Sequence, residues 1–138
     1  MGMDVYKTKI KKLGATRSDV LNKQVRLIFR EVGRKTKRQP YIRSAYFKNE
    51  KIFFTFFWQH LGQKSQTERP KRMRYVPCAL DLIQHSKAEP TIKTNPNRKE
   101  TLYRFTGLTP GGELFYVQIK ENLKSKRKYF MSVFPDTG

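Results

Sequence analysis

The chain has 138 residues, of which 37% are hydrophobic and 13% aromatic, a composition that predicts one folded domain and excludes a disordered chain. Thirty lysines and arginines against eleven aspartates and glutamates give a formal net charge of +19, which favours a polyanionic partner, nucleic acid before an acidic protein. The single cysteine, Cys78, excludes an intrachain disulfide and a cysteine-rich zinc site, and no run has membrane-spanning length, so we expect a cytoplasmic protein without a membrane partner.

The N-terminal part predicts an arm followed by one helix. Residues 1–16 are lysine-rich and only lightly apolar, with Gly14 as a break, and this pattern predicts a flexible arm. Between Ser18 and Val32 the apolar residues recur at near-helical spacing, which predicts an amphipathic helix over 18–32. A basic connector follows and ends at Pro40.

The middle of the chain predicts a buried hydrophobic segment and a second helix. Residues 51–60, K-I-F-F-T-F-F-W-Q-H, predict a strand that leads into a helical turn, although a buried helix fits the same run. Residues 62–74 predict a polar, basic connection. Residues 76–86 predict a helix with Cys78 as a small core residue, and residues 87–99 predict a surface loop.

In the last third of the chain, side chains of different character alternate along 101–106, 114–120 and 129–134, which predicts three strands. Thr109-Pro-Gly-Gly supplies the turn between the first two strands. The resulting prediction is an α+β fold in a single domain, 1–138, with N-terminal helices packed on a curved antiparallel sheet over 101–135.

One face of this terminal sheet is a candidate site. If Phe115, Val117 and Ile119 pack on the helices, together with Tyr129, Met131 and Val133, the opposite face is polar. It would then carry Arg104, Thr106, Tyr116, Gln118, Lys120 and Ser132, with Phe130 and Phe134 as stacking neighbours. Cations among hydroxyl and amide groups suit a phosphate, and aromatic rings suit a base. An ordinary solvent-facing sheet surface is the alternative interpretation.

Further cations and the histidines extend the candidate site. Additional substrate-binding candidates are Arg72 in the basic connection, the loop residues Lys124, Lys126 and Arg127, and His85. The acidic residues are scattered, so we expect neither a metal site nor a cofactor. RNA cleavage without metal needs a base, cations for the phosphate and an acid. His60 or His85 would transfer protons, because histidine titrates near neutral pH, although His85 also reads as a surface residue at a helix end.

The terminal segment carries a family resemblance. The run Y-R-F-T-G-L-T-P-G-G-E-L-F-Y-V-Q-I-K-E, followed by R-K-Y-F-M-S-V-F-P, resembles the sheet of the barnase, EndoU, colicin and RelE-like nuclease superfamily, particularly its phage and mobile-element branches. The resemblance implies helices before a curved antiparallel sheet and RNA cleavage without metal. It implies site roles for Arg104, Lys120 and Ser132, with His60 as the preferred histidine. The final strands contain no histidine, which leaves the general base unassigned.

These observations predict a metal-independent endoribonuclease that cleaves RNA by attack of the 2′-OH on the adjacent phosphate. A toxin is one role that such an enzyme would have. Its catalytic residues would be His60, Arg104, Lys120 and Ser132, and an acidic antitoxin or inhibitor would be a second partner besides RNA. The alternative is a non-catalytic nucleic-acid-binding protein that uses the same sheet face.

Overall fold

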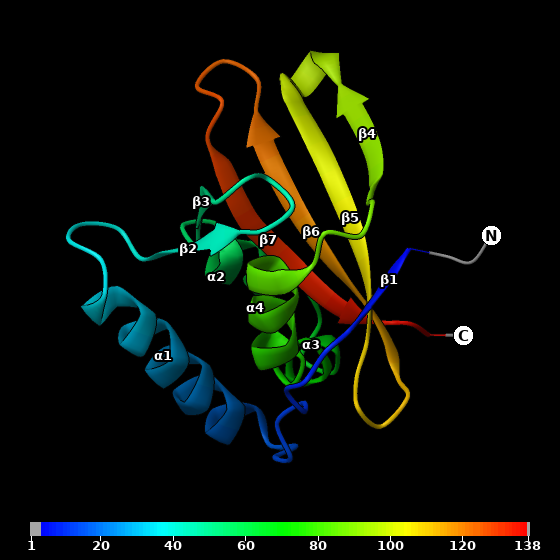
Figure 1. The fold of residues 1–138 in the computed structure, drawn as a ribbon. Helices are drawn as coiled ribbons and strands as arrows, with labels where there is room; N and C mark the ends of the chain where they lie inside the picture. The colour runs from blue at the N-terminus through cyan, green and yellow to red at the C-terminus, as the bar shows by residue number, and fades with distance from the viewer. Residues whose placement is uncertain (1–3, 138) are drawn as a thin grey trace.

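A computed structural model describes residues 4–137 and confirms a single α+β domain in which helices cover one face of a curved sheet (Figure 1). The helices are α1 (Ser18–Arg34), α2 (Phe57–Gly62), α3 (Glu68–Met73), α4 (Val76–His85) and the short 3-10 helix η1 (Pro96–Arg98). The strands are β1 (Val5–Lys7), β2 (Tyr41–Ser44), β3 (Glu50–Phe53), β4 (Thr91–Asn95), β5 (Glu100–Leu108), β6 (Leu114–Asn122) and β7 (Lys128–Pro135).

The sheet contains the predicted antiparallel strands of residues 101–135, and further strands extend it into a mixed sheet. Its strands run in the order β1-β5-β6-β7-β3-β2, and β4 pairs with β5 beside this path. Strands β5, β6 and β7 are antiparallel neighbours as predicted, but β1 pairs parallel to β5 and β3 pairs parallel to β7. Both parallel partners come from distant parts of the chain, so the local hairpin pattern of residues 101–135 carries no sign of them.

The predicted flexible arm is wrong for residues 4–16, while residues 1–3 lie outside the described residues. Strand β1 pairs with Thr106–Leu108 of β5. The Tyr6 hydroxyl donates a hydrogen bond to Asp81 of α4, and the Leu13 amide donates one to the Arg74 carbonyl. The lysine-rich composition predicted solvation, but strand pairing and a few anchoring contacts hold this segment against the domain.

Two segments predicted as irregular are ordered elements. Residues 62–74 contain the short helix α3, and residues 87–99 contain β4 and η1, with β4 as an exposed edge strand paired to β5. The strand-to-helix prediction for residues 51–60 is confirmed by β3 and α2, and the predicted helices are confirmed by α1 and α4. The turn chemistry is also confirmed, since Gly112 has a φ of 87° and its amide donates to the Thr109 carbonyl.

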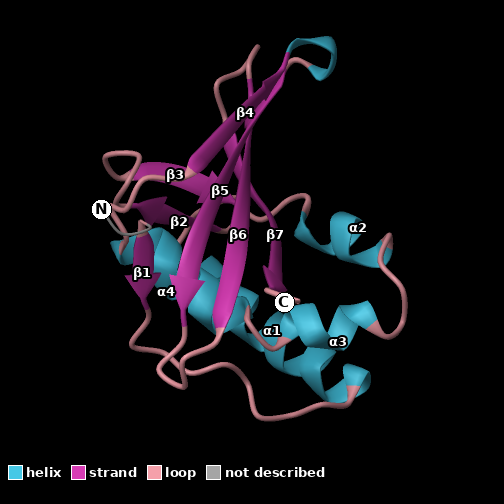
Figure 2. Cartoon of the chain, turned by 90° about the vertical axis from the view of Figure 1, so that its right-hand side faces the viewer, coloured by secondary structure: helices cyan, strands magenta, loops and turns pink. Residues whose placement is uncertain are grey.

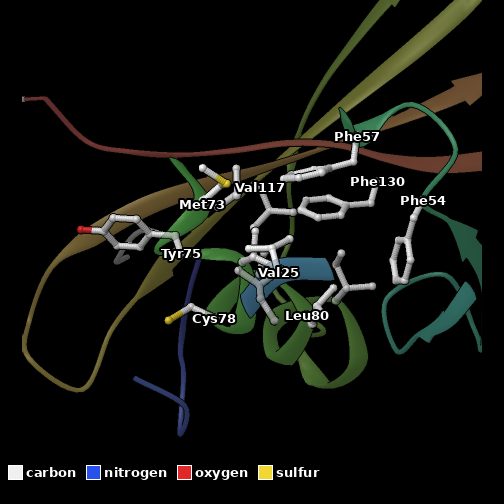
Figure 3. Close-up of a cluster of buried hydrophobic side chains, with 14 of the residues drawn as sticks. Val25, Phe54, Phe57, Met73, Tyr75, Cys78, Leu80, Val117 and Phe130 are labelled. Atoms are coloured by element: carbon white, nitrogen blue, oxygen red, sulfur yellow. The ribbon is translucent and has the colours of Figure 1, made fainter. Parts of the chain in front are cut away.

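The core lies between the sheet and the helices α1 and α4. As predicted, Phe115, Val117 and Ile119 of β6 are buried in it. Figure 3 shows Val25 of α1, Leu80 of α4 and Val117 of β6 in one cluster. Cys78 is fully buried, and burial raises the pKa of its thiol to about 11, so it is the small core residue that the sequence predicted.

A β-bulge in β7 changes which residues face the core. Gln118 of β6 is opposite Ser132, but the next residue, Ile119, is opposite Phe130, so Met131 is an extra residue in β7. Phe130 therefore points into the core, where its ring stacks on Phe57 at a centroid distance of 5.1 Å (Figure 3). The predicted facing of Phe130 and Tyr129 is wrong, because an extra residue exchanges the two faces of a strand.

No helix within residues 4–137 is both long enough and apolar enough to cross a membrane.

Candidate functional site

The candidate site is the outer face of the terminal sheet, which we define as the face turned away from α1 and α4. Figure 2 looks onto this face, with α4 behind the strands and with α2 and α3 beside β7. Three cross-strand rows form it: Thr106–Tyr116–Phe134, Arg104–Gln118–Ser132 and Leu102–Lys120–Tyr129. The structure thus gathers Arg104, Thr106, Tyr116, Gln118, Lys120 and Ser132 on one face of the sheet, as their alternation predicted.

Arg72 reaches this face from α3. Its Nη1 donates a hydrogen bond of 2.9 Å to Oγ of Ser132, and its guanidinium carbon lies 5.1 Å from the centre of the Phe134 ring. Its Nε is buried without a hydrogen-bond acceptor. This Nε has no exposed surface, so an anion would meet the other N–H groups of the half-buried guanidinium.

Arg104 lies against the same ring. Its guanidinium carbon is 5.2 Å from the centre of Phe134 and 5.9 Å from that of Tyr116, and its Nη2 donates to Oε1 of Gln118 at 3.4 Å. Two guanidinium groups, which we call the arginine pair (Arg72 and Arg104), therefore share one aromatic neighbour.

The arginine pair keeps its positive charge. Among the described residues neither guanidinium has a carboxylate oxygen within 4.0 Å. Burial lowers the pKa of Arg72, and the field of Glu68, one helical turn earlier, opposes this effect. Arginine stays protonated through such shifts, so two cations without a directly bonded acid remain on the outer face.

His60 lies at the edge of this cluster. It lines a small gap between α2, α3 and β7 together with Arg72, Met131 and Ser132. Burial, and then the positive charges of Lys64 and Arg72, lower the pKa of His60 below its ordinary value of 6.5. The imidazole is therefore neutral at neutral pH and able to accept a proton.

Two of the predicted catalytic residues are engaged in structural contacts. The Lys120 ammonium lies 3.5 Å from Oε1 of the buried Glu100 and 5.0 Å from the centre of the Phe56 ring. Ser132 is buried and accepts the hydrogen bond from Arg72. The geometry makes Ser132 a positioning residue for Arg72, and it makes Lys120 a cation whose charge is balanced within the domain.

Other predicted binding residues are not part of the cluster. Phe130 is fully buried, so its predicted contact with substrate is wrong. His85 lies at the end of α4, 3.7 Å from Asp81, and lines a different hollow beside Ile28 of α1.

The loop cations lie at the far end of the β6–β7 hairpin. Lys124 and Lys126 are exposed in the loop that joins the two strands, and Arg127 leans on the ring of Phe53 at 4.2 Å. These three cations therefore belong to another surface than the arginine pair.

The outer face also contains residues that the sequence did not single out. The bulge turns Tyr129 outward, where its ring lies 4.6 Å from that of Phe56. The sequence contains one sign of this orientation of Tyr129. The alternation of apolar and polar residues in β7 breaks between Phe130 and Val133, where the bulge lies.

Within residues 4–137 no group of three or more histidine, cysteine, aspartate or glutamate side chains is placed to share a metal ion. Comparison with protein-family models, with curated protein sequences and with solved structures returned no match to this chain.

Proposed function

We propose that the chain binds RNA on the outer face and cleaves it without a metal ion, as a small endoribonuclease of the barnase, EndoU, colicin and RelE-like kind. The observation that carries this proposal is the arginine pair on Phe134, next to an imidazole whose pKa is lowered. Transesterification of RNA requires a base together with cations for the developing charge on the phosphate, and this cluster supplies both.

In the proposed reaction the 2′-OH gives its proton to His60 while its oxygen forms a bond to phosphorus. The bond between phosphorus and the 5′-oxygen breaks, and the leaving oxygen takes a proton from water. The hydroxide that remains takes the proton from His60, which restores the neutral imidazole. The products are a 2′,3′-cyclic phosphate and a 5′-hydroxyl. The arginine pair stabilises the charge on the pentavalent phosphate, Ser132 fixes Arg72, and Gln118 orients Arg104 through their hydrogen bond.

The net charge and the single buried thiol support a proposal about where the protein acts and with which partner. A chain of net charge +19 with one buried, unreactive cysteine suits action on RNA in the cytoplasm, as a toxin held by an acidic antitoxin. Growth arrest on expression, relieved by a co-expressed acidic partner, is the expected behaviour.

A second candidate function is RNA binding without cleavage. It is favoured by the position of Lys120, whose charge is balanced by Glu100, and by the absence of His85 from the outer face. His60 is then the one imidazole at the cluster, so no second histidine is present to protonate the leaving oxygen.

The deciding experiment uses a labelled DNA oligonucleotide that contains a single ribonucleotide, incubated with the protein in excess EDTA. We expect scission only after the ribonucleotide, and mass spectrometry should find a 2′,3′-cyclic phosphate on the 5′ fragment. A matched oligonucleotide with a 2′-O-methyl group at this position should stay intact, because it lacks the attacking hydroxyl. Salt-sensitive binding with no scission of either oligonucleotide would select the second candidate, and equal scission of both would refute the proposed chemistry.

A further inference from the structure

A second strongly basic surface lies beyond the outer face. It is a hollow of about 860 Å³ between the α1–β2 connection, β3 and the loop before β7, and we call it the basic hollow. Its cations are Lys35, Lys37, Arg38, Lys51 and Arg127. No carboxylate lines it, and none of these cations has an acidic oxygen within 4.0 Å in the part of the chain that the structure describes.

Aromatic rings, rather than acids, hold two of these cations in place. The Arg127 guanidinium lies 4.2 Å from the centre of the Phe53 ring and donates to Gln39, and the Lys51 ammonium lies 4.8 Å from the centre of Tyr41. A ring positions a cation without cancelling its charge, whereas a carboxylate does both. The basic hollow therefore presents ordered cations whose charge remains available to a ligand.

A line of rings joins the basic hollow to the outer face. Tyr41 lies 5.9 Å from Phe53, Phe53 lies 6.2 Å from Tyr129, and Tyr129 lies 4.6 Å from Phe56. Phe56 carries the ammonium of Lys120, which belongs to the outer face. Cations accompany Tyr41, Phe53 and Phe56. Phe53 is buried, so the rings that a base can reach are the half-buried rings of Tyr41, Tyr129 and Phe56.

We propose that the basic hollow is a second binding site for single-stranded RNA, which holds backbone phosphates of the strand whose reactive phosphate lies at the arginine pair. Rings that alternate with cations match the alternation of bases and phosphates in a single strand, whereas an acidic peptide has carboxylates but no stacking bases. The proposed path along the rings rests on the proposed function of the outer face, but RNA binding in the basic hollow does not require cleavage.

The test compares the wild type with the triple variant Lys37→Ala, Arg38→Ala and Arg127→Ala. A matched control removes the same number of lysines and arginines from exposed positions elsewhere, as Lys23→Ala, Arg30→Ala and Arg98→Ala. Binding is measured by fluorescence anisotropy with 2′-O-methyl oligonucleotides of about four and about twelve nucleotides, which resist 2′-OH attack and bracket the usual site sizes.

We expect the triple variant to bind the longer oligonucleotide at least about tenfold more weakly than the control does, with a salt slope smaller by about 2, because about three phosphate contacts are lost. The short oligonucleotide should bind the triple variant and the control equally, since it occupies only the outer face. Thermal unfolding should be the same for both variants.

Three results would overturn the proposal. The first is an equal loss of affinity in the control variant, and the second is an unchanged affinity of the triple variant for the longer oligonucleotide. The third is that polyaspartate displaces this oligonucleotide as well as polyuridylate does at the same concentration of charge. The last result would assign the basic hollow to an acidic protein. Cleavage is measured separately, with the oligonucleotide that contains a ribonucleotide. If the chain binds RNA in the basic hollow but cleaves nothing, the proposed binding site stands and the proposed endoribonuclease function is refuted.

Discussion

The arginine pair lies against an aromatic ring, whereas Lys120 and Lys128, at the other end of the terminal strands, lie against carboxylates. Arg72 and Arg104 lie on the Phe134 ring without a directly bonded carboxylate. Lys120 lies 3.5 Å from Glu100, and Lys128 lies 2.7 Å from Glu50 and 3.5 Å from Glu121. Both regions are basic in sequence, but of these two regions only the paired lysines have a carboxylate oxygen within 4.0 Å.

The net charge of +19 is therefore unevenly balanced, because some cations lie against carboxylates and others do not. The ion pairs of Lys120 and Lys128 are partly or fully buried, so breaking them leaves an acid without its partner. We therefore expect substitutions in the arginine pair to change RNA chemistry, and substitutions in the paired lysines to change stability.

The largest expected effect is on cleavage. Arg72→Ala should lower the single-turnover cleavage rate by about 100-fold or more, or about 2.7 kcal/mol, because it removes a positioned cation from the phosphate. Arg104→Ala should act in the same direction without loss of stability, since Arg104 is exposed. Arg72→Lys keeps the charge and should retain part of the activity. A rate within about twofold of the wild type in both alanine variants would remove the arginine pair from the mechanism.

The paired lysines should show the opposite behaviour. Lys128→Met should lower the free energy of unfolding by about 3 kcal/mol in urea titrations, because Glu121, whose side chain is only 13% exposed, is left without its cation. RNA affinity should stay within about twofold of the wild type. The control Lys124→Met, in the exposed loop of the same hairpin, should leave stability unchanged. A large loss of RNA affinity in Lys128→Met would contradict the division between the two regions.

The pH dependence of cleavage should identify the base. Burial, Lys64 and Arg72 lower the pKa of His60 below its ordinary value of 6.5. The neutral imidazole is the active form, so the cleavage rate should decrease on acidification only once the pH is below 6.5. Lys64→Gln removes one of the causes, which raises the pKa of His60 and moves the acid limb of the profile to higher pH. His60→Gln should abolish this limb together with the activity. An acid limb that does not respond to Lys64→Gln would assign it to another group.

The smallest expected effect comes from freeing a paired lysine. Glu100→Gln keeps the size of the side chain but removes the charge that balances Lys120, which is partly exposed and so remains solvated. RNA affinity should rise by about threefold, with a steeper salt dependence, because one more cation meets the strand. An affinity that is unchanged or lower would show that the charge of Lys120 does not reach RNA.

Local patterns were sufficient to predict the parts of the fold that depend on neighbouring residues. The helical spacing within 18–32 and 76–86 predicted α1 and α4, and strict alternation predicted the core face of β6. The same alternation placed Arg104 and Gln118 on one face, and their hydrogen bond follows from that placement.

Arg72 was named among the substrate-binding candidates, but its contacts with Ser132 and Phe134 were not predicted, because it is one of several cations in the run 69–74. Arg69 donates to the carbonyls of Gly62 and Lys64, and Arg74 donates to the carbonyl of Leu13. Only Arg72 bonds to Ser132 of β7. The packing of α3 against β7 makes this choice, and the sequence of the run does not contain it.

The charge follows from composition alone, and the alternating face of β6 and the helices α1 and α4 follow from the period of the side chains. Only the folded structure shows which cations lie against a carboxylate, where β1 and β3 join the sheet, and that Phe130 points inward while Tyr129 points outward. Each of these depends on a partner far along the chain, such as a carboxylate, a parallel strand or the strand opposite a bulge, and local patterning does not encode such partners.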